Sequence, residues 1–125
     1  MSKTSQRELE KIKVCSASYV TALTDTQSII SGKWKLAIIG SLFYGKKRFK
    51  ELEKDILGIT PRMLSKELKD LESKGMIARN VYDSIPVTVE YELTKSGKSF
   101  SEVMDVMVEW GIKHRECIEC RNAQN

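Results

Sequence analysis

Residues 60–75 contain the start, the apolar stripe and the end of one helix, and this stretch limits the possible folds more than any other. Thr60 is a good N-cap, and Pro61 suits the first helical position, where its missing N–H costs nothing. An apolar stripe at helical spacing follows, formed by Leu64, Leu68 and Leu71. Gly75 is a typical residue at a helix end. The stretch therefore predicts a short helix that buries its leucines in a core.

The opposite face of this predicted helix is polar and positively charged, with Arg62, Ser65, Lys66, Lys69 and Ser73. Such a face suits DNA, because a rigid helix can place hydrogen-bond donors in a major groove about 12 Å wide. We expect Arg62 to contact a base edge, since a guanidinium grips guanine through two hydrogen bonds, and Ser65 to contact a base or a phosphate. Lys66 and Lys69 are expected to contact phosphates. The alternative is a solvated helix face without a partner.

Further helices are expected before this one. The spacing predicts a helix over residues 33–43, whose apolar stripe would consist of Trp34, Ala37, Ile38 and Leu42. A short amphipathic helix is expected over residues 48–56, with Phe49, Leu52 and Ile56 on one side. Nearer the start of the chain, residues 5–14 predict a weak helix or an ordered arm, and residues 18–30 predict a helix that ends at Gly32.

Beyond the stretch 60–75 the period changes from helical to alternating. Residues 77–82 and 87–93 predict two strands, joined by a turn. Thr94 would then cap a final helix over residues 95–115. This order of elements forms a winged helix-turn-helix, a DNA-binding motif whose second helix enters the major groove. The predicted fold class is therefore α+β and mostly helical, with a two-stranded wing. Three aromatic side chains on apolar faces are expected to pack in the core or in an interface, and not to stack on a ligand: Trp34, Phe49 and Tyr91.

Positive charge is concentrated in one segment. The chain of 125 residues has 21 Lys and Arg against 17 Asp and Glu, a net charge of +4. Residues 46–69 alone carry eight bases and four acids, so this segment matches the charge of the whole chain. A local basic stripe is expected of a protein that docks on phosphates. Lys46, Lys47 and Arg48 precede the first helix of the motif, which crosses the DNA backbone, although a solvated loop is the alternative.

The predicted wing supplies two weaker candidates. Arg79 on its first strand and Thr88 beyond the turn could reach the DNA backbone or the minor groove. The candidate DNA-binding residues are therefore Lys46, Lys47, Arg48, Thr60, Pro61, Arg62, Ser65, Lys66, Lys69, Arg79 and Thr88.

Several linked motifs occur in one order along the chain. They are Gly-Lys-Trp-Lys at residues 32–35, Gly-Lys-Lys-Arg-Phe-Lys-Glu-Leu at 45–52, and the segments 58–72 and 86–94, with Gly97 and Trp110 after them. Together they resemble the HxlR-type winged helix-turn-helix regulators, which are relatives of the MarR group. The resemblance covers residues 18–113. It divides the chain into an N-terminal arm (1–17), the winged domain (18–113) and a C-terminal tail (114–125).

The resemblance implies a homodimer whose N- and C-terminal helices pack together, so that two recognition helices reach successive major grooves. The expected final helix is apolar over more than one stripe, which also favours an interface. Many family members sense oxidants through a cysteine at the position of Thr21 in this chain, and the nearest cysteine here is Cys15. The expected function is thus a homodimeric, sequence-specific regulator of transcription that binds double-stranded DNA. Residues 60–73 would lie in the major groove and residues 77–93 on the flanking backbone, while the inducing signal stays open.

One group of residues has possible metal or redox chemistry: His114, Cys117 and Cys120. They could belong to a frayed polar tail, or the two cysteines could form a dithiol switch. They could also hold zinc if Cys15 or a partner chain supplied a fourth ligand. We expect the polar tail, and therefore no metal and no cofactor.

The remaining patterns argue against other classes of protein. The chain has a single histidine, no Gly-rich phosphate loop and no His-Glu-x-x-His motif, so an enzyme is not expected. No run approaches the roughly 18 apolar residues of a membrane span, and the polar N-terminus lacks a signal-peptide core, so we expect a cytoplasmic protein. Two alternatives stay open: an adaptor that keeps the fold without binding DNA, and a thiol enzyme that uses Cys117 or Cys120.

Overall fold

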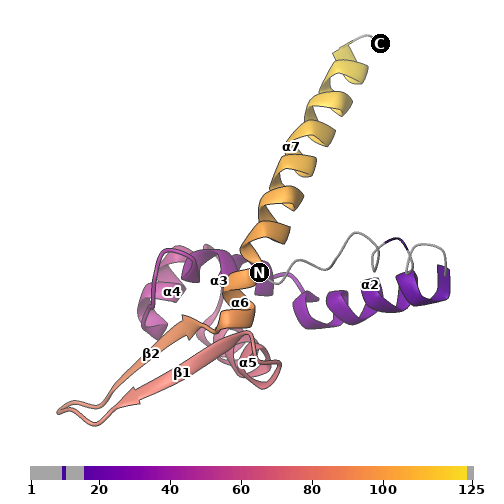
Figure 1. Cartoon of the computed structure of the whole chain (residues 1–125). Helices are drawn as coiled ribbons and strands as arrows, with labels where there is room; N and C mark the ends of the chain where they lie inside the picture. Colours follow the sequence, from indigo (N-terminus) through magenta and orange to yellow (C-terminus); the bar gives the residue numbers. More distant parts are fainter. Residues whose placement is uncertain (1–9, 11–15, 124–125) are drawn as a thin grey trace.

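The computed structural model describes residue 10 and residues 16–123 (Figure 1). Its elements, in order, are α2 (Ser16–Ile30), α3 (Lys35–Leu42), α4 (Phe49–Asp55), α5 (Pro61–Ser73), β1 (Ile77–Tyr82), β2 (Thr88–Leu93), α6 (Lys95–Ser99) and α7 (Ser101–Ala123). The α+β, mostly helical fold class with a two-stranded wing is confirmed. The expected arm over residues 5–14 lies outside the described residues, apart from Glu10.

The core is formed by one side of α3, α4 and α5 together with the base of the wing. Leu64, Leu68 and Leu71 of α5 are at most 1% exposed, as their spacing predicts. In α3 the predicted stripe is partly wrong, because Ala37 is exposed and Ile39 is buried beside Ile38. The buried residues of α3 are Lys35, Ile38, Ile39 and Leu42, which form one helical face rotated from the predicted stripe so that Ile39 replaces Ala37. Trp34, Phe49 and Tyr91 pack against the core, as expected.

The recognition-helix candidate α5 begins and ends as the sequence predicts. The Thr60 hydroxyl accepts a hydrogen bond from the Met63 N–H at 3.2 Å, and Pro61 is the first helical residue. Gly75 has a φ of +78°, a conformation that favours glycine and that ends the helix. These local signals set the length of α5, and the leucines set which face points inward.

The wing is an antiparallel pair, β1 and β2, that protrudes from the helices with its tip far from the core (Figure 1). Its register pairs Ile77 with Leu93, and Arg79 with Tyr91. A third segment joins the pair, because Lys47 exchanges two backbone hydrogen bonds with Tyr91 at 2.9 and 2.8 Å. The wing is therefore attached to the chain just before α4 as well as to α5.

The expected single helix over residues 95–115 is in fact two helices, α6 and α7, separated by Phe100. Gly97 lies so close to the chain that a Cβ there would be 2.2 Å from the Met76 carbonyl oxygen. The Phe100 side chain enters the core, and its N–H bonds to the Gly97 carbonyl in a tight turn. Packing at Gly97 and Phe100 therefore holds α6 on the body, whereas α7 leaves it and continues past residue 115 to Ala123.

The two long helices extend away from the body in different directions. Figure 1 shows α7 rising on the side opposite to α5 and the wing, while α2 extends sideways. Neither α2 nor α7 has a buried residue. None of the helices in the described ranges is both long and apolar enough to cross a membrane.

Candidate nucleic-acid interface

The outward face of α5 gathers the cations that the sequence predicts. Arg62, Lys66 and Lys69 are exposed, and Ser65 between them is partly exposed. In an α-helix, positions 62, 65, 66 and 69 share one face because they are three, four and seven residues apart. This face lies opposite the buried leucines. It therefore combines a fixed helix with side chains that can reach a ligand.

Two of the acidic side chains of α5 point away from this face. The Lys35 ammonium at the start of α3 lies 2.6 Å from Glu67 Oε2 and 2.9 Å from Asp70 Oδ2. Burial on its own would lower the pKa of Lys35, but the hydrogen bonds and charges of Glu67 and Asp70 raise that pKa above its usual value. Hydrogen bonds from Lys35 and then Lys74 lower the pKa of Asp70. Both carboxylates are therefore neutralised on the protein side of α5.

In the described part of the chain, Arg62, Lys66 and Lys69 form no ion pair. Their charge is therefore available to an anionic partner.

Asp70 also connects α5 with α2. Lys74, which follows α5, lies 3.1 Å from Asp70 Oδ2 and donates a hydrogen bond to the Ser28 carbonyl oxygen at 2.5 Å. Lys35, Asp70 and Lys74 therefore join the last turns of α2 to α3 and α5.

The basic cluster before α4 divides into two kinds of residue. Lys46 and Arg48 are exposed, whereas the Lys47 ammonium turns inward to Asp55 and to Ser41 Oγ at 3.0 Å. The hydrogen bonds from Lys47 and then Ser41 lower the pKa of Asp55. Lys46 and Arg48 are thus open to solvent, and Lys47 is engaged within the protein.

The two wing candidates, Arg79 and Thr88, lie in different places relative to α5. Arg79 is on the same sheet face as buried Ile77, and it lines a concavity of about 310 Å³ with Ser65, Lys69 and the acidic Glu72. Thr88 starts β2 near the tip, where its hydroxyl lies 3.2 Å from Ser84 Oγ. The structure therefore groups Arg79 with the face of α5 and leaves Thr88 at a separate location.

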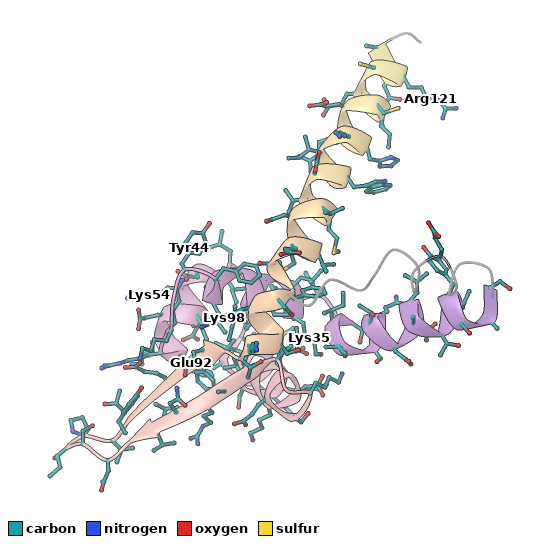
Figure 2. The ribbon with its side chains drawn as sticks, in the orientation of Figure 1. Lys35, Tyr44, Lys54, Glu92, Lys98 and Arg121 are labelled. Atoms are coloured by element: carbon teal, nitrogen blue, oxygen red, sulfur yellow. The ribbon has the colours of Figure 1, made fainter. Side chains whose placement is uncertain are left out.

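Sequence reasoning missed two features of this region. Lys50 and Lys54 of α4 are exposed and add positive charge next to the cluster, although neither was predicted as a DNA-binding residue. The burial of Lys35 was not predicted either; its place between Trp34 and Leu36, in an otherwise apolar stretch, is a weak signal of a buried lysine. Figure 2 shows Lys35 at the junction of the body with α2.

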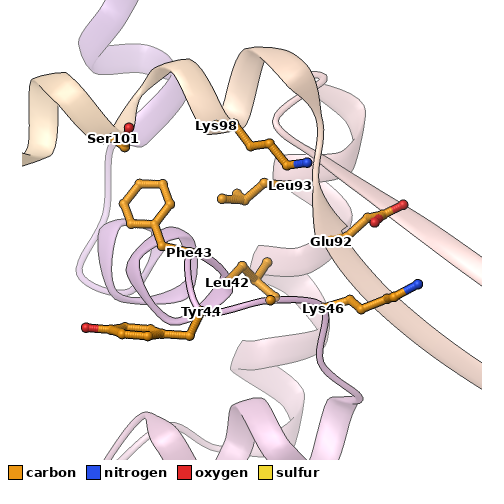
Figure 3. Close-up of a pocket in the computed structure, with 9 residues that line it drawn as sticks. Leu42, Phe43, Tyr44, Lys46, Glu92, Leu93, Lys98 and Ser101 are labelled. Atoms are coloured by element: carbon orange, nitrogen blue, oxygen red, sulfur yellow. The ribbon is translucent and has the colours of Figure 1, made fainter.

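A second concavity, of about 550 Å³, lies between the end of α3, β2 and α6 (Figure 3). Leu42 and Leu93 line its centre, and the charged ends of Lys46, Glu92 and Lys98 lie toward one side of it. No set of nucleophile, base and orienting group is present among these lining residues, so they suggest no catalytic chemistry.

The His114, Cys117 and Cys120 side chains lie along α7, which corrects the expectation of a frayed tail up to Ala123. Both cysteines are free and exposed, and the His114 ring stacks on Trp110 with centroids 4.8 Å apart. Within residue 10 and residues 16–123, no group of three His, Cys, Asp or Glu side chains could hold a metal ion. Cys15, the candidate fourth zinc ligand, lies outside the described residues.

Comparison with known proteins places this geometry among regulators. The model of the HxlR-like helix-turn-helix family matches residues 29–119. The HTH-type transcriptional regulator YtcD of Bacillus subtilis (strain 168) is 41% identical over 96 residues, which are 77% of this chain and 76% of YtcD. An HTH-type transcriptional regulator of Methanothermobacter thermautotrophicus is 43% identical over 93 residues, 74% of this chain and 71% of that protein.

Solved structures agree with this result. A crystal structure of the regulator ytcD superposes with a TM-score of 0.73 at 40% identity and covers 75% of this chain and 96% of its own. The redox regulator HypR in its reduced form superposes with a TM-score of 0.74 at 37% identity, over 79% of this chain and 98% of that one. Both similarities extend over most of the neighbour's length.

Proposed function

Because the chain belongs to the HxlR-like helix-turn-helix family, we propose that it is a homodimeric, sequence-specific regulator of transcription that binds double-stranded DNA. The family supports a DNA-binding regulator of transcription. The dimer, the groove contacts and the residue roles are our own assignment, and so is the expectation that the chain performs no catalysis.

This proposal rests on how the acidic and basic side chains are distributed around α5. The helix has acids and bases, yet Glu67 and Asp70 bind Lys35 while the bases face solvent. The outer face of α5 is thus mainly cationic, with Glu72 as the exposed acid beside Lys69, and such a face fits the phosphate-lined major groove. Arg62 in the first turn would read a base edge, and Ser65 would contact a base or a phosphate.

Phosphate contacts on and around α5 would fix the position of this helix in the groove. Lys66 and Lys69 on α5 would bind phosphates, as would Lys46 and Arg48 before α4. Thr60 and Pro61 would act by fixing where α5 begins, and therefore where Arg62 lies relative to the groove. Arg79 of the wing extends the surface, and Thr88 would touch the backbone only if DNA reaches the wing tip.

A second copy of the chain would complete the molecule. Large apolar side chains on α2 and α7 are between 38% and 65% exposed, which is costly for a lone chain in water. They are Tyr19, Val20, Leu23, Val103, Val106, Met107, Val108, Trp110, Ile112 and Ile118. A symmetric dimer through these helices would bury them and present two copies of α5 to one DNA duplex, about 34–36 Å apart.

The test of this function is selection of bound sequences from a random pool of duplexes, followed by titration of the selected and a scrambled duplex. We expect a preferred site with two half-sites one helical turn apart, and an affinity that falls as salt rises. A protein that binds neither duplex would instead support the adaptor of the same fold.

Thiol sensitivity is a second candidate, and the similarity to HypR, which is described as a redox regulator, favours it. Cys117 and Cys120 are exposed and three residues apart on α7, and helical Cα atoms at that spacing are about 5 Å apart, within disulfide range. Oxidation with diamide should then lower DNA affinity in the wild type and leave the double variant Cys117→Ser/Cys120→Ser unchanged. Equal behaviour of the two proteins would remove this candidate. A thiol enzyme would in addition have to reduce a disulfide substrate with turnover.

A further inference from the structure

Lys35 is the buried charged side chain in the described part of the chain. The residue is 6% exposed, although it lies in the first turn of α3 and not in the middle of the core. A buried ammonium is costly unless it is paired, and Lys35 has two carboxylate partners, Glu67 and Asp70, both on α5. One lysine of α3 therefore neutralises two of the carboxylates of the candidate recognition helix.

We propose that Lys35 is a positioning residue for DNA binding, which holds Glu67 and Asp70 on the protein side of α5 and so keeps Lys66 and Lys69 available for phosphates. This inference rests on the proposed function. Lys35 itself touches no DNA in this account.

Two cations of α5 lie where they could replace Lys35. Lys66 and Lys69 line the same shallow concavity as Lys35, Glu67 and Asp70. Lys66 is also four residues before Asp70 on α5, the spacing at which helical side chains form ion pairs. Without Lys35, Asp70 would draw Lys66 toward itself at that spacing, and Lys69, which borders the same concavity, would lie beside two uncompensated carboxylates.

This exchange would change the DNA-facing surface in two ways. Two lysines would no longer serve as phosphate ligands, and carboxylates would lie close to the phosphates. Lys74 would neutralise Asp70 only in part, because its ammonium is shared with the Ser28 carbonyl oxygen. The affinity for any duplex would fall, with little effect on which sequence is preferred.

The predicted loss of affinity can be separated from a loss of folding. Removing one partner of a buried ion pair leaves the other charge uncompensated, whereas replacing all partners by neutral groups is often tolerated. Lys35→Met therefore frees both carboxylates, while Lys35→Met/Glu67→Gln/Asp70→Asn has no carboxylate left to attract Lys66 and Lys69. Lys33→Met is the matched control: it removes the same charge from an exposed lysine that lies over the Trp34 ring and binds neither acid.

The experiment measures affinity for a mixed-sequence duplex of about 30 base pairs, long enough for two half-sites, over a range of salt concentration. The slope of log affinity against log salt falls by about 0.9 for each phosphate that the protein no longer neutralises. We expect Lys35→Met to reduce the slope by about 2, the triple variant to recover the wild-type slope, and Lys33→Met to reduce it by at most about 1. If Lys35→Met does not fold, the double variants Lys35→Met/Glu67→Gln and Lys35→Met/Asp70→Asn, each with one free carboxylate, should each show about half of that reduction.

Two results would overturn the inference. An unchanged slope in a folded Lys35→Met protein would mean that Lys35 has no influence on the phosphate contacts. A triple variant as defective as Lys35→Met would mean that Lys35 serves only to hold the helices together. Failure of the wild-type protein to bind the duplex at any salt concentration would instead contradict the proposed function, so the two failures are distinguishable.

Discussion

The backbones of Lys47 and Tyr91 are joined by two hydrogen bonds, from Lys47 N to Tyr91 O at 2.9 Å and from Tyr91 N to Lys47 O at 2.8 Å. This pairing attaches the segment before α4 to the wing. It also fixes where the neighbouring lysines point, because successive side chains of an extended segment point to opposite sides. Lys47 turns inward to Asp55, and its neighbour Lys46 stays exposed.

Adjacent lysines should therefore have different roles. We expect Lys46→Ala to reduce the salt slope of DNA binding by about 1 with no change in thermal stability, because it removes a phosphate ligand. Lys47→Ala should lower the melting temperature and leave the salt slope unchanged, because it breaks the pair with Asp55. Calorimetry and binding titrations on the two variants check this. Equal salt slopes for both would contradict the assignment.

Arg62 should carry sequence information. Arg62→Ala is expected to cost about 1–3 kcal/mol of binding free energy on the preferred duplex and to relax the preference for one base pair. The measurement is a titration of wild type and variant on the preferred duplex and on duplexes changed at single positions. If Arg62→Ala lost the same affinity on every duplex, Arg62 would be a phosphate ligand and not a base reader.

Protonation of Asp70 should make the folded protein less stable in acid. Its pKa is lowered by hydrogen bonds from Lys35 and Lys74, so the unfolded chain takes up this proton more readily than the folded one. The contribution of Asp70 is therefore present above about pH 4, the usual Asp range, and is lost as pH falls through the lower folded-state pKa. The melting temperatures of wild type and Asp70→Asn should differ at pH 7 and converge toward pH 3.

Glu116→Gln serves as the control for this experiment, since Glu116 is exposed on α7 and forms no ion pair within the described residues. Its difference from wild type should stay small at both pH values. A gap between wild type and Asp70→Asn that stays constant over this pH range would show that Asp70 does not contribute through its charge.

The apolar surface of α7 should be an interface. Val106 is 64% exposed in the single chain, so Val106→Glu should cost a monomer little stability but should place a charge in the dimer interface. We expect light scattering to show a monomer for this variant and a dimer for Lys95→Ala, which has the same change of net charge on α6. Loss of the second half-site should weaken DNA binding by about 100-fold. A wild-type monomer at micromolar concentration would contradict the dimer.

Local signals made α5 predictable. Its cap at Thr60, its first proline, its leucine stripe and its terminal glycine are all short-range features, and the core-facing side follows from the stripe alone. The same holds for the alternating strands of the wing. The positions of these elements were therefore available from the chain itself.

The errors arise where distant residues decide the outcome. The apolar period continues through Phe100, but α6 ends there, where Gly97 packs closely on Met76 and Phe100 enters the core. Likewise, nothing in the local sequence distinguishes Lys35 and Lys47 from other lysines. Their partners are carboxylates of α5 and α4, which only the fold brings next to them. A charge count can show that a segment is basic, but it does not show which bases are already paired.

The salt dependence of DNA affinity in a charge-matched pair of double variants tests the central claim most directly. Lys66→Ala/Lys69→Ala removes two cations from the outer face of α5. Lys113→Ala/Arg121→Ala removes two from α7, and Figure 2 shows Arg121 far from the body. If α5 binds DNA, the α5 variant should reduce the slope of log affinity against log salt by about 2, while the α7 variant should keep the wild-type slope. Equal slopes in the two variants would contradict the claim that α5 binds DNA.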